Sequence, residues 1–270
     1  MKFVKDLVKR LSPDLFQQLA SIRFFLYCRR TFGPCQQLIA REVFHDGPIK
    51  VLGGPFEGMA YYNKTIWGTI TGKWLGCYEQ EIQPVIAEMI AEQYPTVIDI
   101  GAAEGYYAVG LALKMPRSQV ISYDTDPIAR FRQRQLAELN GISNLEVRKY
   151  CSAAELGTFK DAKAVVICDI EGFEYTLMNP AKSPALRNLD ILIEIHRTEE
   201  HQVSEGAELL EKRFAATHSI TRYHAVDRDR EEMRSRVPEL KNLTDAQTNF
   251  ALDEGRYPGQ IWLWMKARLR

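Results

Sequence analysis

The sequence predicts a doubly wound α/β fold, in which helices cover both faces of a mostly parallel sheet. Three observations support this prediction. Apolar strands alternate with helical patterns over residues 96–214, a glycine turn follows the first of these strands, and several strands end in a carboxylate or a histidine. Helices that return the chain between strands produce parallel sheets. Polar residues at the carboxyl ends of such strands collect on one edge, where α/β enzymes bind ligands.

The individual elements follow from composition and spacing. The expected strands are 96–100, 119–124, 144–150, 164–169, 190–196, 219–225 and 260–266. Apolar residues at helical spacing predict helices over 80–93, 107–113 and 203–214. The glycines of 48–62 predict a small hairpin. The segment 227–241 is dense in charge and is expected as a solvated loop or helix, with a lid over the substrate as the alternative.

Gly101 and Gly105 form the turn that follows the first strand, together with Asp99. Glycine lets the backbone approach a ligand, and the turn aims the free N–H groups of the next helix at that ligand. Ala103 stands where the dinucleotide fingerprint has its second glycine, so the turn favours a nucleoside cofactor over a pyrophosphate. Asp124 ends the second strand 23 residues after Gly101, where a carboxylate accepts hydrogen bonds from ribose hydroxyls.

Three motifs resemble those of a known family. The run 97–106 resembles motif I of class I S-adenosylmethionine-dependent methyltransferases. Residues 168–174 resemble the Asp-x-Glu-Gly-x-Glu signature of the FkbM-type methyltransferases, and 75–79 resemble the Gly-x-Tyr-Glu element that precedes motif I there. The resemblance covers about 76–196. It implies a Rossmann-like, seven-stranded sheet in which 260–266 is the reversed last strand, and S-adenosylmethionine as the cofactor.

The resemblance and the strand ends together define the expected site. The expected cofactor-binding residues are Tyr78, Glu79, Asp99, Gly101, Gly105, Asp124, Ser152 and Asp169. The expected catalytic residues are Asp169, Glu171 and His196. The family usually has Phe-Glu-Pro where this chain has Tyr-Asp124-Thr-Asp126-Pro, so either carboxylate can serve the ribose.

An alcohol acceptor must lose a proton, which calls for a general base. His196 is the candidate base, and an ordinary hydrogen-bonded residue at the edge of the sheet is the alternative. Glu174 belongs to the signature, with an exposed carboxylate at a helix start as the alternative. Asp169, Glu171 and His196 can hold a divalent ion if the fold brings them together, but their spacing requires none and we expect no metal.

Composition limits the partners and the compartment. Lys plus Arg and Asp plus Glu are both 35, so no overall charge favours nucleic acid. The five cysteines form no C-x-x-C pair and are expected as reduced thiols in a cytoplasmic protein. There is no apolar run of 18 residues, hence no predicted membrane-spanning helix.

The N-terminal part differs in character from the rest. Residues 1–30 carry seven basic and two acidic residues, with apolar residues at helical spacing. We expect a helix that stops at Ser12 and a second short helix that starts at Pro13. They either contact a membrane surface or a partner, or form a layer packed on the catalytic domain. The expected division is an accessory, substrate-side part over 1–75 and a methyltransferase domain over 76–270.

The leading interpretation is a methyltransferase that acts on oxygen, and the resemblance suggests a hydroxyl on a sugar, glycan or glycosylated natural product. Transfer to nitrogen is an open alternative. A nicotinamide-dependent oxidoreductase and a non-catalytic binding module are the two further alternatives. The sequence specifies neither the acceptor nor the oligomeric state.

Overall fold

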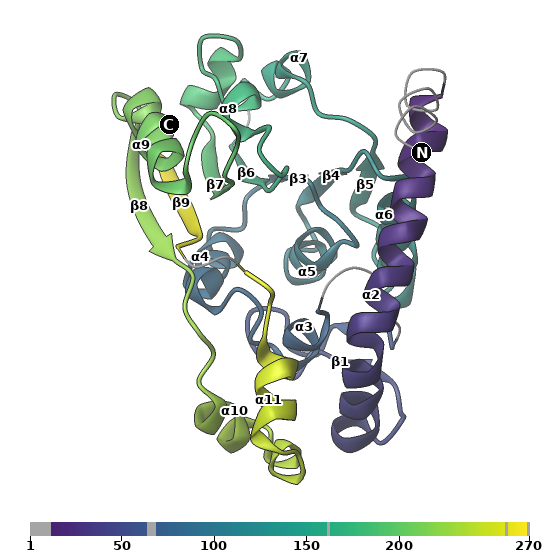
Figure 1. Cartoon of the computed structure of the whole chain (residues 1–270). Coiled ribbons are helices and arrows are strands. Elements are labelled where there is room, and N and C mark those ends of the chain that lie inside the picture. The colour runs from purple at the N-terminus through teal and green to yellow at the C-terminus, as the bar shows by residue number, and fades with distance from the viewer. Residues whose placement is uncertain (1–11, 64–68, 161–162, 257–258, 269–270) are drawn as a thin grey trace.

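A computed structural model describes residues 12–63, 69–160, 163–256 and 259–268. Its centre is a seven-stranded sheet with the strand order β5-β4-β3-β6-β7-β9-β8 (Figure 1). The strands are β3 (Thr96–Ile100), β4 (Gln119–Tyr123), β5 (Leu145–Arg148), β6 (Ala164–Cys168), β7 (Asp190–Ile195), β8 (His218–His224) and β9 (Ile261–Ala267). The strands from β3 to β7 pair in parallel, and β9 runs antiparallel between β7 and β8. This confirms the predicted sheet and its reversed last strand.

Helices cover both faces of the sheet. The helices that follow or precede the strands are α4 (Gln83–Glu92), α5 (Tyr106–Lys114), α6 (Pro127–Leu139), α7 (Ala153–Gly157), α8 (Glu174–Leu177) and α9 (Val203–Phe214). Away from the sheet lie α10 (Arg230–Arg236) and α11 (Asp245–Leu252) (Figure 1). The described residues also form α3 (Thr71–Leu75) and the 3₁₀ turns η1 (Gln80–Ile82), η2 (Pro184–Arg187) and η3 (Pro238–Asn242). Alternate residues of a strand point to opposite faces. Val97 accordingly belongs to the hydrophobic cluster that includes α4 and α5, and Ile98 to the cluster that includes α9.

The central strands are buried along their whole length. All residues of β6 and β7 are buried, as expected for parallel strands covered on both faces. The edge strand β5 is only partly buried. The carboxylate of Glu194 therefore lies in the interior of a fully buried strand, after three apolar residues, and it needs a partner there.

The N-terminal helix is longer than predicted. A single helix, α2 (Pro13–Phe44), replaces the expected short helix, although its start at Pro13 agrees with the prediction. Pro34 lies inside this helix without ending it. Cys28 and Ile39 are fully buried on either side of Pro34, so tertiary packing outweighs the helix-breaking tendency of proline. The other helix expected in this region, over residues 1–11, lies outside the described part of the chain.

The two halves of α2 have different surroundings. In the second half, Ile39 belongs to the same hydrophobic cluster as Val97, and Phe44 contacts Trp74 edge to face. In the first half, Leu19, Ile22, Phe24, Leu26 and Tyr27 are exposed. The helix runs along the side of the molecule on which α6 and β5 lie (Figure 1). None of the helices in the described residues is long and apolar enough to span a membrane.

The remaining predicted elements are confirmed. The hairpin consists of β1 (Ile49–Lys50) and β2 (Ala60–Tyr61), which pair antiparallel. Its loop residue Phe56 lies in the same hydrophobic cluster as α5. The charge-rich segment 227–241 contains α10 and most of η3, so the helix that was one of its expected structures is present.

Candidate active site

A cavity of about 770 Å³ opens at the carboxyl ends of β3, β4 and β6. Its walls include Gly101, Ala103, Asp124, Asp126, Cys151 and Asp169. Phe24 of α2 also lines it, so the N-terminal helix contributes to this cleft. Its volume lies in the range of cavities that bind small molecules and cofactors. The cavity is called the cofactor cleft below.

Asp124 is held firmly at the end of β4. Its Oδ2 accepts a hydrogen bond from the backbone N–H of Ala103 at 2.9 Å, and its Oδ1 accepts one from Asp126 at 2.8 Å. Burial raises the pKa of Asp124 to about 6, against the opposing effect of these two N–H groups. Each oxygen retains acceptor capacity toward the cleft. Asp126 has a different task, because its Oδ1 accepts from Ile128 and caps α6.

A steric contact that the sequence did not indicate requires glycine at position 101 of the turn. Gly101 has φ +87°, and a Cβ there would lie 1.6 Å from the carbonyl oxygen of Asp169. The first requirement for glycine at this position is thus the close approach of the chain leaving β6, rather than the approach of a ligand. Gly105 has φ +99° and precedes α5, where a Cβ would meet Gln133 at 3.1 Å.

Asp99 lies at the end of β3 and is buried. The backbone N–H of Ala108 donates to its side chain, while its Oδ2 has no hydrogen-bond partner among the described residues. Burial, together with the charges of Asp169 and Asp124, raises the pKa of Asp99 to about 8. Asp99 does not line the cofactor cleft. Its buried side chain, which accepts from Ala108 of α5, instead stabilises the glycine turn.

Three predicted cofactor residues have other contacts. Glu79 is buried and bonded to Tyr107 and Arg256. Tyr78 packs against Tyr106, with ring centroids 5.3 Å apart. The hydroxyl of Ser152 accepts from the N–H of Glu155 at 3.1 Å and caps α7. None of the three lines the cofactor cleft, whereas Gly101, Asp124 and Asp169 do.

The three predicted catalytic residues meet at the edge of the sheet. His196 follows β7, and its Nε2 lies 3.5 Å from Oδ1 of Asp169 and 3.6 Å from Oε2 of Glu171. Only 16% of the His196 side chain is exposed, against 86% for Glu171. Asp169 lines the cofactor cleft, so its carboxylate lies between the imidazole of His196 and the cleft.

Glu174 holds the other side of the imidazole. Its Oε1 lies 2.8 Å from Nδ1 of His196 and accepts from the N–H of Ile170 at 3.0 Å. The alternative of an exposed helix-start carboxylate is wrong. Glu174 does begin α8, but it is fully buried, because its side chain is directed at the histidine and the preceding turn. A carboxylate only accepts, so Nδ1 carries the hydrogen and the lone pair of Nε2 faces Asp169 and Glu171.

The surrounding carboxylates set the basicity of His196. Burial alone would lower the pKa of the imidazole, but the hydrogen bond with Glu174 and the charge of Asp169 outweigh burial and raise it above the usual value. Burial raises the pKa of Asp169, which His196 partly offsets. This arrangement can accept a proton at Nε2 and stabilise the resulting imidazolium.

Glu194 and Arg256 are two further functional candidates that were not predicted from the sequence. Oε2 of Glu194 lies 3.8 Å from Nε2 of His196, and its carboxyl group shares a hydrogen bond with Asp169. Nη2 of Arg256 lies 3.6 Å from the other oxygen, Oε1. Burial raises the pKa of Glu194 well above its usual value. The available signal was a carboxylate inside the apolar strand 190–195, which had to find a partner.

The same cluster has a composition that suits a cation. One ligand atom each of Asp169, Glu171 and His196 lies within 4.8 Å of the others. Carboxylate and imidazole groups are common ligands of divalent metals. The sequence predicts that no metal is required, and this stays a prediction.

Comparison with known proteins gives only distant similarity. No family model and no curated protein matches the sequence. Among solved structures, a putative O-methyltransferase from Klebsiella pneumoniae is 12% identical with a TM-score of 0.46, over 70% of this chain and 81% of that one. The O-methyltransferase from Bacillus cereus in complex with SAH is 12% identical with a TM-score of 0.46, over 90% of this chain and 96% of that one.

We assign the fold from the chain itself. The strand order, with β9 reversed between β7 and β8, is that of the Rossmann-like methyltransferase fold. The cofactor cleft lies at the carboxyl edge of this sheet, where the fold binds ligands.

Proposed function

We propose that this protein is an S-adenosylmethionine-dependent methyltransferase that methylates oxygen. One observation carries the proposal: the cleft that contains Gly101 and Asp124 also contains Asp169, and Asp169 lies beside Nε2 of a histidine whose Nδ1 is hydrogen-bonded to Glu174. The FkbM-type signature at 168–174 supports it, because this segment supplies Asp169, Glu171 and Glu174.

The residues suggest a simple division of labour. When bound, S-adenosylmethionine supplies a methyl group on a positively charged sulfur. Asp124 binds the ribose hydroxyls. Transfer requires the acceptor oxygen to lie in line with the methyl carbon, and this alignment provides much of the rate. As the oxygen–carbon bond forms and the sulfur–carbon bond breaks, Nε2 of His196 accepts the hydroxyl proton. Glu174 orients the ring and stabilises its charged form.

We further propose that the acceptor is a hydroxyl on a sugar, a glycan or a glycosylated natural product. The enzyme then works in the cytoplasm, where its five free cysteines stay reduced. A screen of sugar-containing acceptors with a labelled methyl donor tests the proposal. Labelled, alkali-stable methyl ether on a sugar is the expected product. Label that appears only on amines would contradict transfer to oxygen.

Replacing Asp124 by alanine is expected to weaken donor binding. One or two hydrogen bonds to a charged acceptor are lost, each worth about 1–3 kcal/mol, or about 5-fold to 150-fold in affinity. Calorimetry with S-adenosylmethionine measures the loss. The matched comparison is Asp126→Ala, which removes the cap of α6 and should cost about 1 kcal/mol of stability. Asp126 also lines the cofactor cleft, and we expect its replacement to weaken donor binding less than Asp124→Ala does. If Asp126→Ala weakens binding and Asp124→Ala does not, the ribose contact belongs to Asp126.

The first half of α2 carries a second proposal, contact with an anionic membrane surface. Exposed apolar residues lie beside Arg23, Arg29 and Arg30, which are exposed on the same helical segment. Exposed basic side chains attract anionic lipid, and exposed apolar side chains bury area at the bilayer surface. The full-length protein should therefore sediment with phosphatidylserine-containing vesicles at low salt, and Ile22→Glu with Leu26→Glu should abolish this. If the wild-type protein ignores such vesicles, this segment of α2 has no membrane role.

A further inference from the structure

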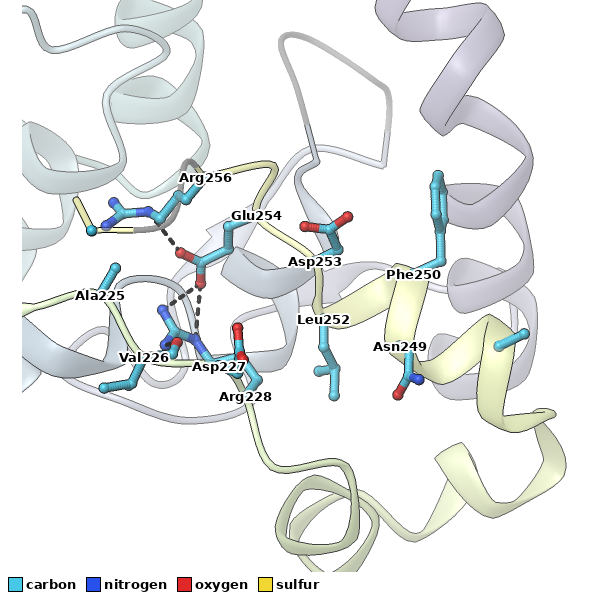
Figure 2. A pocket seen from close by; sticks show the side chains of 12 residues that line it. Ala225, Val226, Asp227, Arg228, Asn249, Phe250, Leu252, Asp253, Glu254 and Arg256 are labelled. Carbon is cyan, nitrogen blue, oxygen red and sulfur yellow. Dashed lines mark hydrogen bonds and ion pairs between the residues drawn. The ribbon is translucent and has the colours of Figure 1, made fainter. Parts of the chain in front are cut away.

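A second cavity, of about 820 Å³, lies between the chain after β8 and the helix α11 (Figure 2). Its walls include Asp227, Arg228, Asn249, Phe250, Glu254 and Arg256. His224 at the end of β8 and Ile195 at the end of β7 both pair with Ile261 of β9. The segments that form the cavity thus leave the sheet at the edge where His196 follows β7. The cavity is called the α11 pocket below.

Arg256 links the α11 pocket to the proposed catalytic group. It lines the pocket, and its Nη2 lies 3.6 Å from Oε1 of Glu194. The other oxygen of Glu194 lies 3.8 Å from Nε2 of His196. A single carboxylate therefore separates the pocket wall from the imidazole on one side, as Asp169 separates the cofactor cleft from it on the other.

The cations of the α11 pocket are already neutralised. Arg228 pairs with Glu254 at 2.7 Å and with Glu81 at 3.1 Å (Figure 2 shows its bonds to Glu254). Arg256 pairs with Glu81 at 2.8 Å, with Glu254 at 3.1 Å and with Glu79. Arg228 is nearly inaccessible, with 3% of its side chain exposed. Neither guanidinium is left uncompensated to bind a phosphate or carboxylate.

The accessible groups of the pocket suit a neutral, hydroxyl-rich ligand. Asp227, Asp253 and Asn249 are exposed and offer acceptors to hydroxyl groups. Phe250 stacks on Phe32 of α2 at 6.1 Å and is 39% exposed, which offers an apolar surface to the C–H face of a sugar ring. Oε2 of Glu254 is buried and contacts Arg256, yet it accepts no hydrogen bond within the described residues. Its charge is compensated by Arg256, so Glu254 belongs to the ion-pair network behind the pocket wall.

We infer that the α11 pocket binds the acceptor, and that this acceptor is an uncharged sugar or glycoside rather than a sugar phosphate or a uronic acid. The inference rests on the proposed methyltransferase function for its role in turnover, but ligand binding by the pocket is measurable without turnover. Exposed carboxylates attract hydroxyl donors and repel anions, and the paired arginines do not compensate that repulsion.

Saturation-transfer NMR on the full-length protein tests the inference. The probes are methyl glycosides of neutral hexoses, with the hexose 6-phosphates and the uronic acids as charged counterparts. The neutral glycosides should receive saturation from the protein and the charged ones should not. Asn249→Ala and Asp227→Asn should each weaken glycoside binding by about 10-fold. The surface controls Asn188→Ala and Glu208→Gln should bind as the wild type does.

The outcomes separate the inference from the proposed function. If charged sugars bind as well as neutral ones, or if the pocket variants bind as the wild type does, the inference is wrong. If labelled methyl transfer to a sugar proceeds with unchanged KM in Asn249→Ala and Asp227→Asn, the function stands and the acceptor site lies elsewhere. If S-adenosylmethionine fails to bind while neutral glycosides bind the pocket, the pocket assignment stands and the methyltransferase proposal falls.

Discussion

Replacing His196 by alanine is expected to lower turnover by about 10²-fold to 10⁴-fold, the usual loss when a general base is removed. Donor affinity should be unchanged, because His196 is absent from the wall of the cofactor cleft. Single-turnover transfer of labelled methyl measures the first effect and calorimetry the second. His224→Ala is the control, since His224 is exposed at the end of β8.

The pH dependence distinguishes a base from a structural histidine. His196 accepts a proton only when neutral, so turnover should fall as pH drops below its pKa. Since Glu174 and Asp169 raise that pKa, the fall should begin above the ordinary histidine value of about 6.5. Glu174→Gln removes the charge and should shift the fall to lower pH. A His196→Ala rate within a few-fold of wild type would exclude His196 as the base.

Gly101→Ala is expected to destabilise the protein by about 4 kcal/mol or more, a larger loss than most single substitutions cause. Two costs combine. A residue with a Cβ pays about 1–2 kcal/mol for the left-handed conformation. The new Cβ would also lie 1.6 Å from the Asp169 carbonyl oxygen, so β3 and β6 must separate at the point that bears Asp169. Urea unfolding measures the stability.

Two other glycines separate these costs. Gly141 has φ +65° and open space around its Cβ position, so Gly141→Ala should lose only about 1–2 kcal/mol. Gly157 lies in α7 with neither problem, and Gly157→Ala should be neutral or stabilising by up to about 1 kcal/mol. Equal losses at Gly101 and Gly141 would mean that contact with Asp169 is unimportant.

Local patterns were sufficient to predict the sheet. The strands β3, β4, β6 and β7 are short, mostly apolar runs, as burial on two faces requires, and a polar residue directly follows β4, β6 and β7. The extent of α2 was not predictable in this way. Pro34 is a strong local signal against a continuous helix, and only the burial of Cys28 and Ile39 against the rest of the chain outweighs it.

The site was predictable as a set of strand ends but not as a network. Strand order alone brings Asp169 and His196 together, because β6 and β7 are neighbours. Glu174 was visible in the signature at 168–174, but its burial depends on the path of the turn before α8. Arg256 gave no signal, since it reaches Glu194 and Glu79 across more than 60 residues of intervening chain.

The most direct test of the central claim is a calorimetric titration of the wild-type protein with S-adenosylmethionine, and separately with NAD and NADP. The structure predicts saturable binding of S-adenosylmethionine at one site. It predicts no binding of NAD or NADP, because Ala103 occupies the position at which the pyrophosphate of these cofactors requires glycine. Binding of a nicotinamide cofactor, with no detectable heat from S-adenosylmethionine, would contradict the methyltransferase assignment.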